Sequence, residues 1–214
     1  MTLQPGILLS TAYFAPVSYF ATLAAFDERS IEQHEHFSKQ TYRNRAVILG
    51  ANGPVSLIVP VEKGREQKIK IRDLRIAYDE EWQRNHWRTI FSAYNSSPFF
   101  EYYADDVQPF FRKKHTFLFD YNMLITQTLL KAMELPHELN LTEGFEQVPD
   151  STLNLRDRFS PKPHRHQPVP GFTALPYTQV FSDKFGFLTD LSILDMLFNE
   201  CPSDTALFED SWKE

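Results

Sequence analysis

The sequence is poor in glycine and has a single cysteine. Its 214 residues include 7 glycines, and neither G-x-G-x-x-G nor G-x-x-x-x-G-K-[ST] occurs among them. These motifs let the backbone approach a pyrophosphate closely, so their absence argues against a dinucleotide site and against a P-loop. The one cysteine, Cys201, cannot form an intramolecular disulfide, and no histidine lies near it in the sequence. A disulfide scaffold is therefore excluded, and a cysteine nucleophile is not expected.

Positive charge is scarce as well. Lysine and arginine number 22 against 28 aspartate and glutamate residues, which leaves a formal net charge of -6. Nucleic-acid binding depends on basic side chains that neutralise phosphates, so we expect no nucleic-acid partner. Aromatic residues are abundant, with 19 Phe, 9 Tyr and 3 Trp, and they argue against disorder. The length suits one globular domain over residues 1–214.

An apolar stretch covers residues 7–26. It lacks a start with lysine or arginine, and serine, threonine and proline interrupt it, unlike a signal peptide or a membrane span. We predict a buried strand over residues 7–13 and a helix over residues 17–26, which begins near Pro16 because proline suits the first helical position. We therefore expect no membrane span, and the absence of a targeting signal favours the cytoplasm.

The next segments predict strands. Residues 29–37 form a second strand, and a strand–helix–strand unit usually pairs its strands in parallel. Asn52 and Gly53 lie between the apolar runs 45–49 and 55–61, which is a strong signal for a hairpin turn. The expected fold class is α/β, with a mixed sheet begun by these two units and a helical C-terminal half.

Helical periodicity dominates the rest of the chain. The pattern predicts helices over residues 80–94, 106–133 and 190–201, the second interrupted near Pro109. Asp79 is the expected N-cap of the first helix, and Ser192 with Asp195 is the expected capping box of the last.

Between the last two helices the chain is rich in proline and polar residues from 136 to 176, and it includes the run PKPHRHQPVPGF. We predict a long loop or lid over this stretch, with its proline-rich part at about 156–176. Long loops without secondary structure of their own are commonly functional or mobile, so this loop is a candidate lid.

Residues 31–45 hold an unusual density of titratable and hydrogen-bonding side chains. If residues 30–37 form a strand, Glu32, His34 and His36 share one face of it and the intervening side chains share the other. Such convergence suits a site for an anionic or polyhydroxylated small molecule. The alternative is a solvated face or an edge strand, where charged side chains are common.

The same strand face raises the question of a metal. Glu32, His34 and His36 could hold zinc with one open position. No fourth candidate ligand lies at a sequence spacing typical of a zinc site, so we expect no metal. A phosphate is a further candidate at the start of the helix after Pro16, where free backbone N–H groups would point outward. Nothing in the sequence identifies a cofactor.

His86 lies on the predicted helix of residues 80–94, one turn after Trp82 and at the boundary of the apolar face. Imidazole titrates near neutral pH, so His86 could act as a general base that faces a crevice over the sheet. The alternative is a packing residue between Trp82 and Trp87, which is the commoner role for such a histidine.

Several segments, distinctive as a set, carry a resemblance to a known family. They are YFAP at 13–16, IEQHEHFSKQTYRNRAVI at 31–48, WQRNHWRTIFSAYNSSPFFEYY at 82–103, LRDRFSPK at 155–162 and DLSILDMLFNECP at 190–202. On these segments the chain resembles the WbqC-like proteins of bacteria, which are often encoded among surface-polysaccharide genes. The resemblance implies one intracellular α/β domain and a role in glycan or lipopolysaccharide biosynthesis. Ala46 and Cys201 depart from it, because they stand where cysteine and glycine are expected.

These observations predict an enzyme of surface-polysaccharide (O-antigen or capsule) biosynthesis, a transferase acting on a small-molecule substrate such as a nucleotide-activated amino sugar. Its site would lie at the carboxyl ends of the early strands, where open α/β sheets expose a crevice. We expect His34 or His36 to act as general base, oriented by Glu32 or Glu35. Arg43 and Arg45 would bind an anionic group of the substrate, and Lys39, Tyr42 and Asn44 would contact sugar or acyl oxygens. Trp82 and His86 would form the wall of the pocket. The runner-up is a non-catalytic ligand-binding or assembly protein of the same pathway. A cleft that joins residues 31–45 to His86 would favour the enzyme.

Overall fold

A parallel sheet and a separate hairpin supply the strands of this protein. The computed structural model describes residues 6–62, 68–145, 148, 151–162, 164–200, 208 and 210–212. The parallel sheet contains β1 (Gly6–Ser10), β2 (Arg29–Glu32), β5 (Asn140–Leu141) and β6 (Thr152–Asn154). Its strand order is β5-β2-β1-β6. The antiparallel hairpin consists of β3 (Arg45–Gly50) and β4 (Gly53–Ile58).

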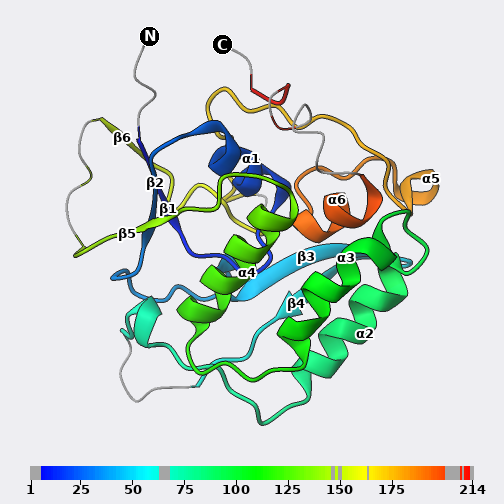
Figure 1. Cartoon of the computed structure of the whole chain (residues 1–214), viewed down its shortest axis with the longest axis horizontal. Coiled ribbons are helices and arrows are strands. Elements are labelled where there is room, and N and C mark those ends of the chain that lie inside the picture. The colour runs from blue at the N-terminus through cyan, green and yellow to red at the C-terminus, as the bar shows by residue number, and fades with distance from the viewer. Residues whose placement is uncertain are drawn as a thin grey trace.

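Helices make up most of the second half of the chain. They are α1 (Val17–Ala25), α2 (Trp82–Tyr94), α3 (Phe100–Val107), α4 (Leu118–Ala132), α5 (Ser182–Phe185) and α6 (Ile193–Asn199), with short 3-10 turns η1 (Tyr42–Asn44), η2 (Ile71–Asp73) and η3 (Gln108–Phe111). Figure 1 shows the parallel sheet on one side of the molecule next to α1, and the hairpin on the other side next to α2 and α3. The predicted α/β class with a helical C-terminal half is confirmed. Within the described ranges, no helix is long and apolar enough to cross a membrane.

The predicted strand–helix–strand unit is confirmed. β1 and β2 pair in parallel with Ile7 opposite Arg29, and α1 connects them. Ile7, Leu9 and Ile31 are completely buried, because a parallel sheet that carries a crossover helix has at least one face covered.

The predicted hairpin is also confirmed. Gly50 pairs with Gly53, so Ala51 and Asn52 form a two-residue turn. Gly53 has a φ of 113°, a backbone conformation that L side chains rarely adopt. α2 and α6 both pack against β3, which joins the hairpin to the helical half of the chain.

Several expected boundaries are wrong, among them those of the helix predicted over residues 106–133, of which residues 112–117 are not helical. The strand predicted over residues 29–37 ends at Glu32. The Glu32 carboxylate accepts a hydrogen bond from the backbone N–H of His34 at 2.7 Å, and this contact accompanies a bend in the chain. Glu32, His34 and His36 therefore do not share a strand face. The N-cap of α2 is Glu81 and not Asp79, and no side chain caps it.

The capping box predicted for the last helix forms only in part. Ser192 is the N-cap of α6, and its hydroxyl accepts from the N–H of Leu194 at 3.4 Å. The Asp195 carboxylate instead turns into the interior, where it accepts from three side chains at once, so its expected role as a cap is wrong. The donors are Tyr94 Oη at 2.9 Å, Tyr177 Oη at 2.8 Å and Gln179 Nε2 at 3.0 Å. Cys201 and Pro202 lie outside the described residues.

The stretch from residue 136 to 176 is not a loop throughout. β5 and β6 lie within it and complete the two edges of the parallel sheet, β5 against β2 and β6 against β1. The narrower proline-rich loop at about 156–176 has neither helix nor strand in its described part, apart from an isolated bridge between Phe172 and Trp212.

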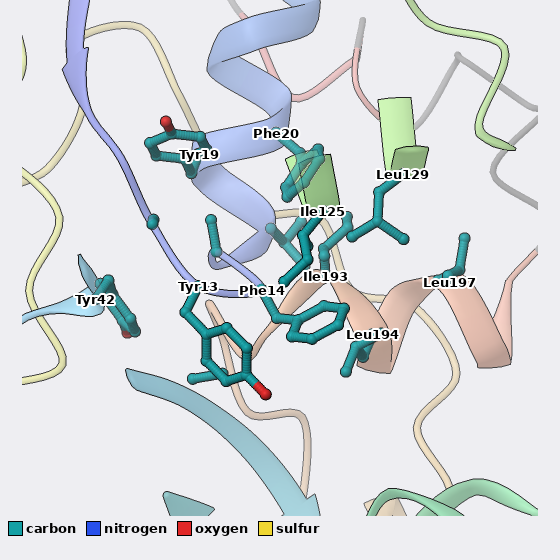
Figure 2. Packing of buried hydrophobic residues seen from close by; sticks show 14 of the residues in the cluster. Tyr13, Phe14, Tyr19, Phe20, Tyr42, Ile125, Leu129, Ile193, Leu194 and Leu197 are labelled. Carbon is teal, nitrogen blue, oxygen red and sulfur yellow. The ribbon is translucent and has the colours of Figure 1, made fainter. Parts of the chain in front are cut away.

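One hydrophobic cluster extends from Ile7 to Phe208 and draws on the sheet, the hairpin and the helices. Figure 2 shows how the segment between β1 and α1 contributes: the Phe14 ring points toward Ile193 and Leu194 of α6. The Tyr13 ring instead packs against His86 of α2 and Tyr121 of α4. A single continuous core is what one domain requires, and we retain a one-domain organisation as a proposal.

Candidate functional site

The carboxyl edge of the parallel sheet carries a dense group of polar side chains. Ser10 ends β1, Glu32 ends β2, Thr142 follows β5 and Arg156 follows β6. Because all four strands are parallel, their carboxyl ends lie along the same edge, where open α/β sheets bind ligands. We call Ser10, Glu32, Glu35, Arg43, Thr142 and Arg156 the edge cluster.

Glu32 lies at the centre of one half of the edge cluster. It is 1% exposed, and its carboxylate accepts from Arg156 Nη1 at 3.0 Å and from the Thr142 hydroxyl at 2.9 Å. The backbone N–H of His34 is its third donor. Three donors satisfy a buried carboxylate that would otherwise be costly to hold in the interior.

Glu35 and Arg43 form the other half. Arg43 donates through Nε to one carboxylate oxygen at 2.8 Å and through Nη2 to the other at 2.5 Å, which is bidentate geometry. Arg43 Nη2 also donates to Ser10 Oγ at 2.8 Å, so the hydroxyl at the end of β1 joins the ion pair. Burial opposes the charged guanidinium, but the hydrogen bonds and the charge of Glu35 outweigh it and raise the pKa of Arg43. Arg43 therefore keeps its positive charge at neutral pH.

The third carboxylate of this region, that of Asp157, contributes little to the stability of the Arg43 contacts. Asp157 Oδ1 lies 3.5 Å from Arg43 Nη2, and its side chain is 93% exposed. An exposed ion pair of this length is typically worth less than about 1 kcal/mol. Asp157 is thus a contact that a competing anion could displace.

A small cavity lies beside the edge cluster. Its lining residues are Ser10, Thr11, Ala12, Tyr19, Tyr42, Arg43, Arg156 and Phe159. The room at its centre is about 10 Å³, enough for one water molecule or one hydroxyl group. Figure 2 shows Tyr19 and Tyr42 on either side of the chain as it leaves β1.

Two larger hollows lie elsewhere on the described part of the molecule. One of about 430 Å³ lies between the ends of α1 and α4 and the aromatic side chains of Phe208 and Trp212. Another of about 330 Å³ lies between the hairpin turn and α2. Each has a single charged residue in its lining, Glu134 in the first and Arg88 in the second. We favour the edge cluster despite its smaller cavity, because convergent polar chemistry and not volume distinguishes a site.

His34 is the one predicted histidine that contacts the edge cluster. Its ring Nε2 lies 3.1 Å from the carbonyl oxygen of Thr142. A carbonyl can only accept, so this contact assigns the proton of the neutral ring to Nε2 and leaves Nδ1 as the basic nitrogen.

The structure brings only part of the predicted site together. Glu35, Arg43, Tyr42 and His34 lie in or beside the edge cluster. His36 and Lys39 are exposed, and neither side chain has a contact with it. Asn44 is buried and donates to the carbonyl of Val59 at 2.9 Å, which ties η1 to the end of the hairpin.

Arg45 and Trp82 also lie apart from the cluster. Arg45 begins β3, and its buried Nε has no hydrogen-bond partner among the described residues. It shares no ligand with Arg43, so the two arginines do not form the expected pair of anion-binding groups. Trp82 is buried at the start of α2 and donates to the carbonyl of Ala77 at 3.0 Å.

His86 is buried among aromatic rings, away from the edge cluster. Its Nδ1 lies 2.9 Å from the hydroxyl of Tyr13, and the Trp82 ring lies 5.2 Å away, centroid to centroid. Burial lowers the pKa of His86 to about 4, although a hydrogen bond to the carbonyl of Ile58 acts in the opposite direction. His86 is therefore neutral at pH 7, with both ring nitrogens engaged. None of the cavities described above has both His86 and a residue of 31–45 in its lining.

The predicted phosphate position at the start of α1 is already occupied. Asp190 Oδ1 accepts from the backbone N–H of Ser18 at 2.9 Å, and the carbonyl of Leu191 accepts from Val17 at 3.0 Å. The Asp190 carboxylate thus occupies the position at the positive end of the helix where an anion would bind. The expectation of a phosphate there is wrong.

The sequence reasoning missed several residues of this site. Ser10, Thr11, Thr142, Arg156 and Asp157 lie far from residues 31–45 in the sequence. Arg156 and Asp157 belong to the LRDRFSPK segment, whose alternating charges after a short apolar run were the available signal. Among the described residues, no group of three or more His, Cys, Asp or Glu side chains is placed to hold a metal ion.

Comparisons with known proteins identify the family. The chain is 30% identical over 128 residues to the uncharacterized protein Rv1507c of Mycobacterium tuberculosis (strain ATCC 25618 / H37Rv). That match covers 59% of this chain and 53% of the relative, so the chain spans about half the length of the curated relative it matches. No solved structure matches. The family model for the WbqC-like protein family matches residues 11–160, and this chain belongs to that family.

Proposed function

We propose that this protein is an enzyme of bacterial surface-polysaccharide biosynthesis, a transferase that binds an activated amino sugar at the carboxyl edge of its parallel sheet. The family resemblance supports the pathway. The observation that carries the site is the edge cluster itself, where the buried pair of Arg43 with Glu35 and the partly buried pair of Arg156 with Glu32 lie next to a cavity.

Stability alone is a weak explanation for such a cluster. A buried ion pair often stabilises a fold no better than apolar residues of the same size, because both charges must be desolvated. Convergent polar groups beside a cavity are a common feature of ligand sites. Both pairs also stand at the position in the fold where open α/β sheets bind their ligands.

The described contacts assign roles within the site. Nε and Nη2 of Arg43 donate to Glu35. Its Nη1 donates to no described residue and can bind a phosphate or carboxylate oxygen. Arg156 would bind a second anionic oxygen from the opposite side. His34, with Nδ1 unprotonated, is the general base, and Tyr42 contacts the sugar from the cavity wall.

A non-catalytic ligand-binding or assembly protein of the same pathway is the second candidate. One observation favours it: the cavity has room for one water molecule and does not extend to His86. An enzyme would have to open this edge before a sugar could enter.

A binding screen followed by a reaction assay tests the proposal. Thermal shift would be measured with UDP-, GDP- and dTDP-linked sugars and with acyl and aminoacyl donors. A binder at ~100 times its dissociation constant stabilises the fold by about 2.7 kcal/mol, which is readily detected. Arg43→Lys should weaken that binding, and Arg72→Lys, a partly exposed arginine on η2, serves as the matched control.

Mass spectrometry of the incubated mixtures separates the two candidates. A transferred group on an acceptor supports the enzyme, whereas binding without turnover supports the second candidate. If no compound of the panel binds, the proposed function is wrong.

A further inference from the structure

One exposed aromatic side chain, that of Phe145, lies at the carboxyl edge of the parallel sheet. Phe145 is 63% exposed and does not belong to the hydrophobic cluster formed by the described residues. It stands three residues after Thr142, whose hydroxyl donates to the carboxylate of Glu32 at 2.9 Å. A single apolar side chain at a protein surface is ordinary, so the exposure of Phe145 is informative only through what its ring contacts.

The Phe145 ring is stacked against an arginine of the edge cluster. The guanidinium carbon of Arg156 lies over the ring, 4.7 Å from its centroid. Arg156 donates through Nη1 to Glu32 at 3.0 Å and through Nε to Asn154 Oδ1 at 3.1 Å, so hydrogen bonds in its own plane fix the guanidinium. The fixed guanidinium covers one face of the ring and orients it. Because Phe145 is 63% exposed, the opposite face is open to a ligand.

The two arginines of the edge cluster each keep one terminal nitrogen that donates to no described residue. These nitrogens are Nη1 of Arg43 and Nη2 of Arg156, and both side chains line the same cavity. Their positive charges are offset by Glu35 and Glu32, which reduces the attraction for a further anion. Phosphate contacts alone would therefore bind a ligand weakly, and an uncharged contact has to supply part of the affinity.

A flat aromatic face beside phosphate-binding nitrogens suits a nucleotide. Stacking of one base on an aromatic side chain strengthens binding by about 5- to 150-fold, and every base has a face that can stack. A sugar 1-phosphate or a lipid-linked sugar has no aromatic base to place there. The open ring also lies outside the closed cavity, so a base can reach it without any opening of the sheet edge.

We propose that Phe145 is the platform on which the base of a nucleotide-activated sugar stacks, while its phosphates contact Arg43 and Arg156. This inference rests on the proposed function and deepens it, because it identifies the activating group of the substrate as a nucleotide. Arg156 connects the two parts of the site: the face of its guanidinium supports the Phe145 ring, and its Nη2 is available to a phosphate oxygen.

Calorimetric titration of wild type, Phe145→Ala, Phe145→Leu and Phe145→Tyr tests the platform. The probes are UDP, GDP, dTDP, their sugar conjugates, a hexosamine 1-phosphate and inorganic pyrophosphate. Phe145→Ala and Phe145→Leu should bind the nucleotides about 5- to 150-fold more weakly than wild type and pyrophosphate equally well, because neither side chain offers a flat aromatic face. Phe145→Tyr keeps that face and should bind every probe like wild type.

Tyr102→Ala is the matched control, because Tyr102 is an exposed aromatic residue of α3, 74% exposed, away from the edge cluster. Its affinities should equal those of wild type. Both alanine variants remove exposed rings, so their melting temperatures should stay within a few degrees of wild type.

The possible failures of the two proposals are distinguishable. If wild type binds a nucleotide and Phe145→Ala binds it as tightly, the platform is wrong and the proposed function stands. If Phe145→Ala weakens binding of the nucleotide sugar but not of the nucleoside diphosphate, the ring contacts the sugar and the base platform is wrong. Binding of the hexosamine 1-phosphate without binding of any nucleotide overturns the substrate class alone. If wild type binds none of the probes, both proposals are wrong.

A fluorescence measurement provides a second readout that a purely structural role of Phe145 would not produce. In Phe145→Trp, stacking of a base on the new indole should quench its emission when a nucleoside diphosphate is added, and pyrophosphate should leave the emission unchanged. Tyr102→Trp should show no such quenching with either probe. Equal responses of the two variants to a nucleoside diphosphate that both bind would overturn the platform.

Discussion

Arg156 and Glu32 join the ends of β6 and β2 through a contact of 3.0 Å between residues 124 positions apart in the sequence. Glu32 ends β2 and Arg156 follows β6, so the pair spans the carboxyl edge across β1. Arg156 also lies over the ring of Phe145, with its guanidinium carbon 4.7 Å from the ring centroid. The ion pair with Glu32 places the cation of Arg156, which comes from the proline-rich half of the chain, in the site formed by the N-terminal strands.

Arg43→Lys should lower both stability and ligand affinity. Lysine cannot reproduce the two parallel hydrogen bonds to Glu35, and each lost bond to a charged group costs about 1.5–3 kcal/mol. Urea unfolding of Arg43→Lys and Arg72→Lys checks this, and the control should stay within about 0.5 kcal/mol of wild type. Equal stability of the two variants would mean that the bidentate contact contributes nothing.

His86→Gln should make stability less dependent on pH. The folded state holds the pKa of His86 at about 4, below the unfolded value, so on acidification the unfolded chain takes up this proton first. Stability from this group is therefore present above pH 6.5 and is lost as the pH falls toward 4. Between pH 7 and pH 5 the loss amounts to about 2 kcal/mol. Urea unfolding at both pH values should show this loss in wild type and not in His86→Gln.

The same variant tests the predicted role of His86 in catalysis. A general base contributes about 10²–10⁴-fold in rate, whereas a packing residue contributes to stability alone. Given the contacts of His86 with Tyr13 and Ile58, we expect His86→Gln to turn over normally wherever it is folded. A loss of turnover of a hundredfold or more in folded protein would restore His86 to the mechanism.

Tyr177→Phe should destabilise the protein through Asp195. Burial raises the pKa of Asp195 even though Tyr177, Tyr94 and Gln179 donate to its carboxylate, so the loss of one donor leaves a poorly compensated buried charge. The expected cost is about 1.5–3 kcal/mol. Tyr102→Phe is the control, because the Tyr102 side chain is 74% exposed. Equal melting temperatures for the two variants would contradict this role of Asp195.

Metal removal should have no effect on stability. We expect the purified protein to contain no stoichiometric zinc and to keep its melting temperature in EDTA. Elemental analysis that finds about one zinc per chain, lost in His34→Ala, would contradict this expectation and support a metal site at His34 and His36.

Local signals in the sequence were sufficient for part of the fold. Asn52 and Gly53 predict the hairpin because their backbone preferences act within a few residues. The parallel pairing of β1 with β2 follows from the helix between them. β5 and β6 were missed because they have 2 and 3 residues, include asparagine, and are strands only where β2 and β1 provide partners.

The same distinction holds for the candidate site. Glu32, Glu35 and Arg43 could be selected from sequence because they lie within fifteen residues of one another. Their partners Thr142 and Arg156 could not, because only the order of the sheet brings them to Glu32.

Hydrogen–deuterium exchange with and without a bound nucleotide sugar tests the central claim most directly. If the carboxyl edge is the site, the ligand should slow exchange in residues 8–12, 29–35 and 155–162 and leave α2 and the hairpin turn unchanged. Protection confined to the hollow between α2 and the hairpin turn, or no protection anywhere at saturating nucleotide sugar, would contradict the account.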